Sequence, residues 1–318
     1  MPYPQPRCSY SIETDSPHKL AVKEYGPENG YPVVFLHGGP GSGCRNSLCD
    51  FFDLEKFRII APDQRGAGGS TPKGCLEQNE TQHLVEDIEL IRNSLAIEKW
   101  MVVGGSWGAL LAIAYAENYP SAVTGIVLRS LFLGGDDEIQ RAFIDLPKIF
   151  YPELYEIFIG LLPDDERQEP LQAYYKRILN DDPSISHPAT FVWHDYERAL
   201  SVLQLPVSTD RILPSKLSLD VIGKRDQMPA TPRMEAHYFS NHCFLSPGLL
   251  LEKADCLHNI PGIIVQARYD LLCPPQTAHS LARRWPHSRV VTVEKAGHSQ
   301  SEAGITEATR RAVTALVS

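Results

Sequence analysis

The chain alternates short apolar runs with segments in which apolar residues recur at helical spacing. Each apolar run lies between turn-forming glycines and prolines, a pattern that predicts a strand buried on both faces. The predicted strands span residues 33–36, 57–61, 100–103, 125–128, 262–267 and 288–293. Helical spacing follows the second strand at Leu84, Val85, Ile88, Ile91 and Leu95. Strands that alternate with helices predict an α/β fold with a mostly parallel central sheet flanked by helices.

The middle of the chain has a different pattern, which predicts a mainly helical insertion. Aromatic-rich amphipathic segments such as 138–158 and 171–179 are interrupted by prolines, among them Pro183 and Pro188. After these segments the strand pattern returns, and a closing helix is predicted over 305–316. The predicted domains are an α/β core of residues 1–133 and 247–318 and a helical insertion of residues 134–246.

Composition and charge narrow the class of protein. The 318 residues include 30 Lys plus Arg and 39 Asp plus Glu, and the net charge of −9 argues against binding to nucleic acid or an anionic membrane. No secretory signal and no apolar run of about 18 residues is present, so no membrane span is predicted. Seven cysteines form an odd set without a C-x-x-C pair. Reduced thiols and a cytoplasmic location are therefore expected.

A candidate nucleophile lies in the segment Gly104-Gly-Ser-Trp-Gly108. This G-x-S-x-G sequence directly follows the predicted strand 100–103 and precedes a helical run at 109–117, which is the context of a nucleophile elbow. Small residues are needed around the serine because the turn is sharp and strained. Ser106 is thus predicted to project above the edge of the sheet as a nucleophile.

The segment His37-Gly-Gly-Pro-Gly41 follows the predicted strand 33–36 and is a candidate oxyanion hole. Glycines allow a backbone N–H group to approach a developing oxyanion without a side chain in the way. We expect the two donors to be the N–H groups of Gly39 and Trp107. The sequence leaves open which of Gly38 and Gly39 points inward.

A serine nucleophile needs a base and a carboxylate that orients the base. In an α/β fold with a nucleophile elbow, the carboxylate (Asp) follows the serine along the chain and the base (His) comes last. Asp270 and His298 come shortly after the last two predicted strands, at the sheet edge where Ser106 is expected. His279 and His287 lie inside or beside predicted helices and are interpreted as surface residues. No dinucleotide, Walker A or zinc-peptidase motif is found, so neither a cofactor nor a metal is predicted.

Together these segments resemble the prolyl aminopeptidases (proline iminopeptidases), which are serine peptidases of the α/β-hydrolase fold. The resemblance runs from about residue 5 to the C-terminus. The matching segments are His37-Gly-Gly-Pro-Gly41, Asp63-Gln-Arg-Gly66, Gly104-Gly-Ser-Trp-Gly108, Arg268-Tyr-Asp270 and Gly297-His-Ser299. The resemblance implies hydrolysis of small peptides after an N-terminal proline by a triad of Ser106, Asp270 and His298.

The resemblance also implies that the helical insertion is a cap domain that binds the substrate. Trp193-His-Asp-Tyr-Glu197 and Glu235-Ala-His-Tyr-Phe239 are similar to the family's segments whose glutamates hold the charged amine of the substrate. Two carboxylates in a water-poor site would recognise an ammonium group strongly. The positions similar to the family's proline-ring pocket are Phe132, Phe143 and Phe239, of which Phe143 stands where a tyrosine is common.

The sequence departs from the family pattern at two positions outside the triad. Gly69 stands where an arginine is usual, and Ser130 stands where a glycine usually follows Arg129. Two other functions are kept beside the peptidase. One is an esterase or amidase that acts on small acyl substrates, and the other is a ligand-binding protein that has lost turnover. The oligomeric state is left open, a homo-oligomer included.

Overall fold

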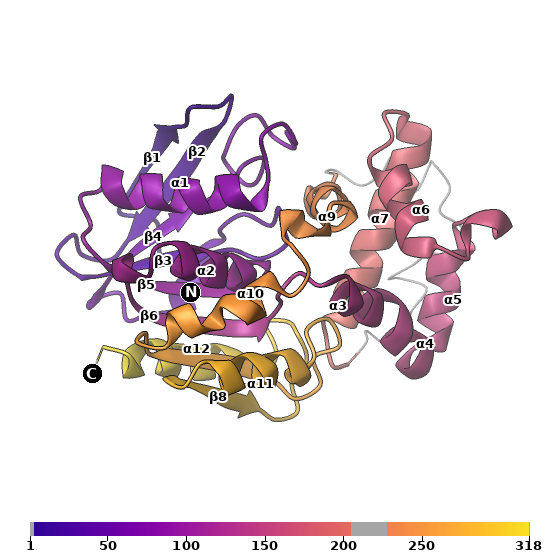
Figure 1. The fold of residues 1–318 in the computed structure, drawn as a ribbon. Coiled ribbons are helices and arrows are strands. Elements are labelled where there is room, and N and C mark those ends of the chain that lie inside the picture. Colours follow the sequence, from indigo (N-terminus) through magenta and orange to yellow (C-terminus); the bar gives the residue numbers. More distant parts are fainter. Residues whose placement is uncertain (1–2, 205–227, 318) are drawn as a thin grey trace.

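The computed structural model describes residues 3–204 and 228–317, which are built around one eight-stranded sheet (Figure 1). The strand order is β1-β2-β4-β3-β5-β6-β7-β8. Pairing is antiparallel between β1, β2 and β4 and parallel from β4 through β8. The strands are β1 (Cys8–Glu13), β2 (Lys19–Tyr25), β3 (Tyr31–Leu36), β4 (Phe57–Pro62), β5 (Trp100–Ser106), β6 (Val123–Leu131), β7 (Gly262–Ala267) and β8 (Ser288–Val293). The predicted α/β fold with a mostly parallel sheet is confirmed.

Helices cover both faces of the sheet. The helices α1 (Thr81–Ser94), α2 (Trp107–Asn118) and α11 (Pro275–Arg284) pack on one face, where they bury side chains such as Val34 and Val102. Helix α12 (Ile305–Ala315) and the short helix η1 (Asn46–Phe51) bury the opposite face, including the neighbouring Val33 and Met101. Adjacent residues of one strand thus enter different cores, which is why the strands are continuous apolar runs.

Between β6 and β7 the described residues form helices joined by turns and loops, with no strand, and residues 205–227 of the predicted insertion lie outside the described residues. These helices stand to one side of the sheet in Figure 1. They are α3 (Asp136–Gln140), the π-helix η3 (Arg141–Asp145), α4 (Leu146–Phe150), α5 (Pro152–Gly160), α6 (Pro170–Ile178), α7 (Pro183–Leu200) and α9 (Thr231–Ser240). The shorter turns are η2 (Pro120–Ala122), η4 (Asp164–Glu166), η6 (His242–Phe244), α10 (Leu249–Glu252) and η7 (Lys253–Leu257).

Two prolines give the insertion helices other boundaries than the sequence pattern predicts. The helix expected over 138–158 is interrupted at Tyr151, whose φ of −140° and ψ of 58° are not helical. Pro152 accounts for this break because proline disfavours the helical conformation of the residue before it. Pro188 was expected to end a segment but lies inside α7. A proline costs a helix one hydrogen bond, and the burial of the aromatic face of α7 offsets this cost.

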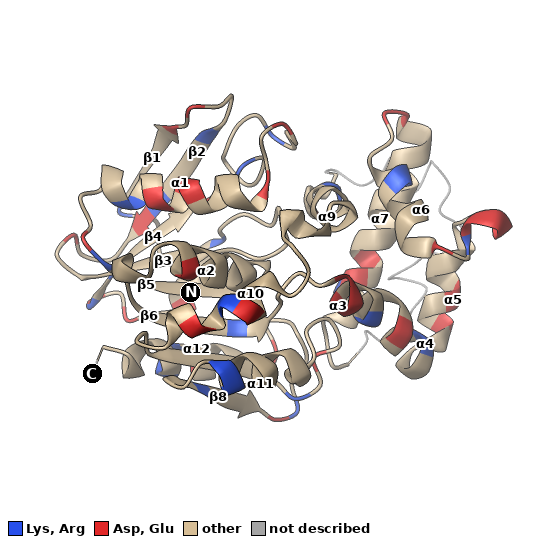
Figure 2. Ribbon diagram, in the orientation of Figure 1, with Lys and Arg blue, Asp and Glu red and all other residues tan. Residues whose placement is uncertain are grey.

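Charged residues of both signs are interspersed over the sheet region and the helical insertion (Figure 2). No helix in residues 3–204 and 228–317 has the length and apolar composition needed to cross a membrane.

Candidate active site

The predicted nucleophile lies at a sharp turn from strand to helix. Strand β5 ends at Ser106, and α2 begins at the next residue. Ser106 has a φ of 55° and a ψ of −124°, a conformation that non-glycine residues rarely adopt. A Cβ atom at Gly104 would lie 2.1 Å from the carbonyl oxygen of Gly108, and one at Gly108 would lie 2.0 Å from that of Leu36. The turn therefore requires glycine at both positions, and it places Ser106 at the positive end of α2.

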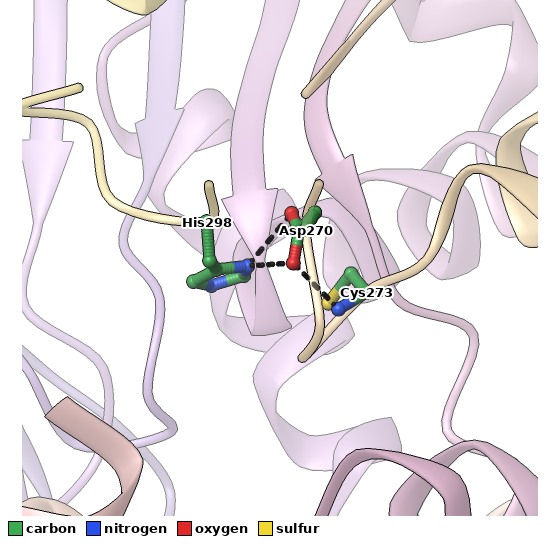
Figure 3. A group of neighbouring side chains, drawn as sticks. All are labelled: Asp270, Cys273 and His298. Atoms are coloured by element: carbon green, nitrogen blue, oxygen red, sulfur yellow. Dashed lines mark hydrogen bonds and ion pairs between the residues drawn. The ribbon is translucent and has the colours of Figure 1, made fainter. Parts of the chain in front are cut away.

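Asp270 and His298 form a buried hydrogen-bonded pair on the loops after β7 and β8 (Figure 3). The Nδ1–H group of His298 donates to both carboxylate oxygens of Asp270, each at 3.0 Å. The backbone N–H of Cys273 donates to Asp270 Oδ1 at 2.8 Å, and Arg129 Nη1 donates to the carbonyl oxygen of His298 at 2.7 Å. With Nδ1 occupied, the pair leaves Nε2 of the ring as the atom that can accept a proton.

Ser106 and His298 border the same cavity, which has a volume of about 580 Å³. Within the part of the chain that the structure describes, no hydrogen bond joins the Ser106 hydroxyl to the His298 ring. Cys273 lies near Ser106, and burial raises the pKa of its thiol well above its ordinary value. Hydrogen bonds between a nucleophile and its base commonly tighten only when substrate binds.

Asp270, Cys273 and His298 also have the composition of a metal site. Each offers one ligand atom, and these atoms lie within 4.8 Å of one another. In this structure, however, the carboxylate of Asp270 holds the ring of His298 by a hydrogen bond, which is the arrangement of an orienting acid and a base. We interpret the cluster in that way, with Cys273 as a neighbour of the nucleophile.

Gln64 connects the two segments predicted to form the oxyanion hole. Its backbone N–H donates to Nε2 of His37 at 3.0 Å, and its side-chain amide donates to the carbonyl oxygen of His37 at 2.9 Å. The same side chain accepts a hydrogen bond from Trp107 Nε1 at 2.9 Å. Gly38 and Gly39 both border the cavity with Ser106, and Gly39 has a φ of 110°. Gln64 belongs to the motif Asp63-Gln-Arg-Gly66, but no sequence pattern indicates this bridging role.

The structure brings the two predicted glutamates together. Glu197 lies on α7, one turn after Trp193, and Glu235 lies on α9, one turn before Phe239. Trp193 Nε1 donates to Glu235 Oε2 at 2.7 Å, and the carboxyl groups of Glu197 and Glu235 are hydrogen-bonded to each other. Burial and the nearby Glu197 raise the pKa of Glu235 well above its usual range, and burial also raises the pKa of Glu197. Two carboxyl groups this close favour the retention of one proton between them when no cation is bound.

The three predicted aromatic residues line a small cavity of about 30 Å³ beside the nucleophile. Phe132, Phe143 and Phe239 border it together with Ser106 and both glutamates. The ring of Phe239 meets those of Phe132 and Phe143 edge to face, with centroid separations of 5.9 Å and 6.4 Å. The cavity is thus apolar on one wall and acidic on another, with a hydroxyl between them.

Comparisons with known proteins agree with this geometry. A family described as the alpha/beta hydrolase fold matches residues 31–304. The proline iminopeptidase of Arabidopsis thaliana is 41% identical over 304 residues, which cover 95% of this chain and 77% of that protein. The probable proline iminopeptidase of Leptolyngbya boryana is 39% identical, with coverage of 95% and 92%. The chain belongs to the proline iminopeptidase family of α/β hydrolases.

Solved structures share the fold of this proline iminopeptidase family member. The proline iminopeptidase from Mycobacterium smegmatis matches with a TM-score of 0.63 at 18% identity and covers 98% of each chain. A thermophilic esterase from Thermogutta terrifontis matches with a TM-score of 0.64 at 21% identity and covers 98% of this chain and 100% of its own. Identities this low support the fold alone.

In this family member, hydrogen bonds and a ring contact join the helices of the insertion to the loops around Ser106 and His298. At the end of α7, the carbonyl oxygen of Ser201 accepts a hydrogen bond from the backbone N–H of Ser299 at 2.8 Å. The backbone N–H of Leu203 donates to Glu302 Oε1 at 3.0 Å. On α9, the ring of Tyr238 packs against that of Trp107 with a centroid separation of 4.4 Å. The helices that carry the glutamates are therefore fixed to the loops around Ser106 and His298.

Of the two departures from the family pattern, Gly69 lies in a turn and Ser130 lies near the end of β6. The backbone N–H of Gly69 donates to Asp63 Oδ2 at 2.8 Å. Ser130 is buried and has a φ of 50°, in the left-handed region that glycine adopts without strain. Ser130 therefore has a strained backbone conformation at a position where the family usually has glycine.

Proposed function

We propose that this protein is a serine exopeptidase that releases an N-terminal proline from small peptides through an acyl-enzyme. The observation that carries the proposal is the position of Glu197 and Glu235, which border the same small cavity as Ser106. A hydrolase that recognises a free amine must bind its charge close to the scissile carbonyl. Two buried carboxyl groups next to the nucleophile meet that requirement.

In the proposed mechanism, Ser106 attacks the prolyl carbonyl while His298 takes its proton through Nε2. Asp270 keeps the ring in the tautomer with Nδ1 protonated and stabilises the imidazolium that forms. The oxyanion is held by the backbone N–H groups of Gly39 and Trp107, which the contacts of Gln64 hold in place. His298 then protonates the leaving amine, and water cleaves the prolyl ester by the reverse transfer.

The carboxyl pair sets the register of the substrate in this proposal. The ammonium group of the substrate replaces the shared proton, so that both Glu197 and Glu235 are charged in the complex. A residue before the proline would remove the ammonium group and place a peptide group against unpaired buried carboxylates, at a large cost in free energy. Phe132, Phe143 and Phe239 supply the apolar walls that a proline ring requires.

The proposal is tested by comparing three reporter substrates. Proline 4-nitroanilide has the free amine, N-acetyl-proline 4-nitroanilide lacks it, and 4-nitrophenyl acetate tests a general esterase or amidase. We expect rapid release from the first, little from the second, and none above background in Ser106→Ala. Preference for the acetyl ester over the prolyl amide would replace the peptidase with the esterase or amidase. Full activity of Ser106→Ala would remove Ser106 from the mechanism.

We further propose that residues 134–246 form a cap domain on a core of residues 1–133 and 247–318. Support comes from the small cavity, whose walls include residues of both parts. Limited proteolysis that cuts only within 134–246, with the two core segments still associated, would support this division. A cytoplasmic location is proposed from the seven free cysteines and is tested by cell fractionation.

A further inference from the structure

Ser106 lies between two cavities whose lining residues differ in charge. One is acidic, and the other is mainly basic. Ser106, Gly39 and Glu197 border both the small cavity and the large one. The small cavity is lined by carboxyl groups and carries no basic residue among the residues described. The large cavity, of about 580 Å³, has three arginines in its lining, and Glu197 is the only acidic residue that the described chain contributes to it.

Two of these arginines are available to a ligand. Arg129 is buried and already donates to the carbonyl oxygen of His298 and to the Ser130 hydroxyl. Arg45 and Arg198 are exposed, and neither forms an ion pair or side-chain hydrogen bond within residues 3–204 and 228–317. Among other exposed arginines, Arg268 is paired with a carboxylate, whereas Arg284 and Arg289 are not, and none of the three borders the large cavity. Arg45 and Arg198 thus bring two unpaired guanidinium groups to one cavity in a chain with a net charge of −9.

The two arginines reach the cavity from different parts of the chain. Arg45 lies just before η1, on the loop that continues from Gly38 and Gly39. Arg198 directly follows Glu197 on α7, so one helix presents an acid toward the amine site and a base toward the large cavity. Ser47 and Gln300, which hydrogen-bond to each other at 3.1 Å, add polar groups to the same wall.

The chemistry of the proposed substrate matches this asymmetry. When the prolyl residue occupies the small cavity, the leaving peptide extends from Ser106 into the large one. The only fixed charge of a short leaving peptide with neutral side chains is its C-terminal carboxylate. Guanidinium groups bind carboxylates with directional, charge-assisted hydrogen bonds. A cavity of this volume is also within the range of small-ligand sites.

We propose that Arg45 and Arg198 bind the C-terminal carboxylate of the leaving peptide, so that the preferred substrates are short peptides with a free C-terminus. The inference rests on the proposed function, because it takes the small cavity as the prolyl site. Substrate recognition is then two-ended, with carboxyl groups for the amine and arginines for the acid. Because both arginines are exposed, we expect a free acid to be preferred over its amide by about tenfold, with a smaller ratio at high salt.

The test compares Pro-Gly-Gly with Pro-Gly-Gly-amide by the release of proline. The measured quantity is the ratio of kcat/KM for the acid to kcat/KM for the amide, which cancels any general loss of activity. We expect a ratio of about ten in the wild type, a lower ratio in Arg45→Gln and in Arg198→Gln, and a ratio near one in the double variant. Arg289→Gln removes an exposed arginine from the edge strand β8 and is the control; it should keep the wild-type ratio.

The outcomes separate this inference from the proposed function. A wild-type ratio near one, or a double variant that keeps the wild-type ratio, overturns the role of the two arginines while proline release from proline 4-nitroanilide still supports the peptidase. Failure to release proline from Pro-Gly-Gly, from Pro-Gly-Gly-amide and from proline 4-nitroanilide overturns the proposed function itself. A ratio that falls as salt is added supports a charge interaction, and a salt-independent ratio contradicts it.

Discussion

Trp193 Nε1 donates a hydrogen bond of 2.7 Å to Glu235 Oε2, and this bond joins the two helices that carry the acidic pair. The indole of Trp193 is itself held by stacking on Phe143, with a centroid separation of 4.5 Å. The carboxyl group of Glu235 is therefore fixed in orientation before any ligand arrives. Preorganisation of this kind lowers the entropic cost of binding an ammonium group.

Removing one charge of the pair should weaken binding of substrates with a free amine. Loss of one partner of a buried charge pair costs about 2–5 kcal/mol, so we expect Glu235→Gln to lower kcat/KM for proline 4-nitroanilide by about thirtyfold or more, mainly through KM. Glu197→Gln should act in the same direction. Steady-state kinetics provide the measurement. Glu156→Gln, an exposed carboxylate on α5, is the control, and an equal loss in that variant would contradict the assignment.

The shared proton of the pair predicts a pH dependence of KM. Burial and mutual proximity raise the pKa of Glu235 and burial raises that of Glu197, so the empty site is protonated at low pH. An ammonium group binds once this proton has left. KM for proline 4-nitroanilide should therefore fall as pH increases from about 5.5 to about 7.5, while the substrate amine remains charged. A KM that rises over this range, or that has the same profile in Glu235→Gln, would contradict the shared proton.

A carboxyl group away from the active site, that of Glu117, also has a raised pKa. Burial raises the pKa of Glu117 on α2 to about 8, and its Oε1 atom has no hydrogen-bond partner in the described structure. The folded state binds this proton more tightly than the unfolded state, so stability is lost as pH increases from about 4.5 to above 8. Glu117→Gln should unfold about 2–4 °C above the wild type at pH 9 and at the same temperature at pH 5. Thermal unfolding at both pH values is the measurement, and an equal shift at pH 5 would point to another cause.

Asp270 should affect the rate of the reaction rather than binding. Asp270→Asn keeps the shape of the side chain but no longer holds the His298 tautomer with Nδ1 protonated, and a substitution of this kind in a Ser-His-Asp triad lowers kcat about 10⁴-fold. We expect a loss of similar size in kcat for proline 4-nitroanilide with little change in KM. Asp255→Asn, at an exposed position, serves as the comparison. A loss confined to KM would exclude the orienting role.

Gln64 should influence kcat through the segments that it connects. Gln64→Met removes the side-chain bonds to the His37 carbonyl oxygen and to Trp107 Nε1 while keeping the volume. Because it acts through the oxyanion donors, we expect a loss in kcat of about tenfold, smaller than the loss on deletion of a donor itself. Trp107→Phe removes only one of the two bonds and should lose less. If Gln64→Met lowered the melting temperature and left kcat unchanged, Gln64 would be only a structural residue.

Local backbone rules account for the parts of the site that could be predicted from sequence. A Cβ atom at Gly104 or Gly108 would lie 2.1 Å or 2.0 Å from a backbone carbonyl oxygen, so both positions require glycine. Such requirements produce a recognisable sequence pattern. Asp270 and His298 follow strands of one parallel sheet, whose carboxyl ends necessarily meet at one edge. Their hydrogen-bonded pairing follows from that topology.

Other features depend on tertiary contacts that no local pattern records. Gln64 contacts residues 27 and 43 positions away, and its role emerges only when three loops meet. The strands β1 and β2 lack the apolar runs of the inner strands, and every second residue of β1 is exposed. The apolar-run criterion therefore finds the buried strands and misses this edge.

The hydrogen bonds from Ser299 to Ser201 and from Leu203 to Glu302 have a consequence for how substrate enters. They connect the end of α7 to the loop that carries His298, so the insertion could not swing open as a hinged lid without breaking them and displacing the base. Movement of the end of α7 is therefore coupled to the position of the His298 ring.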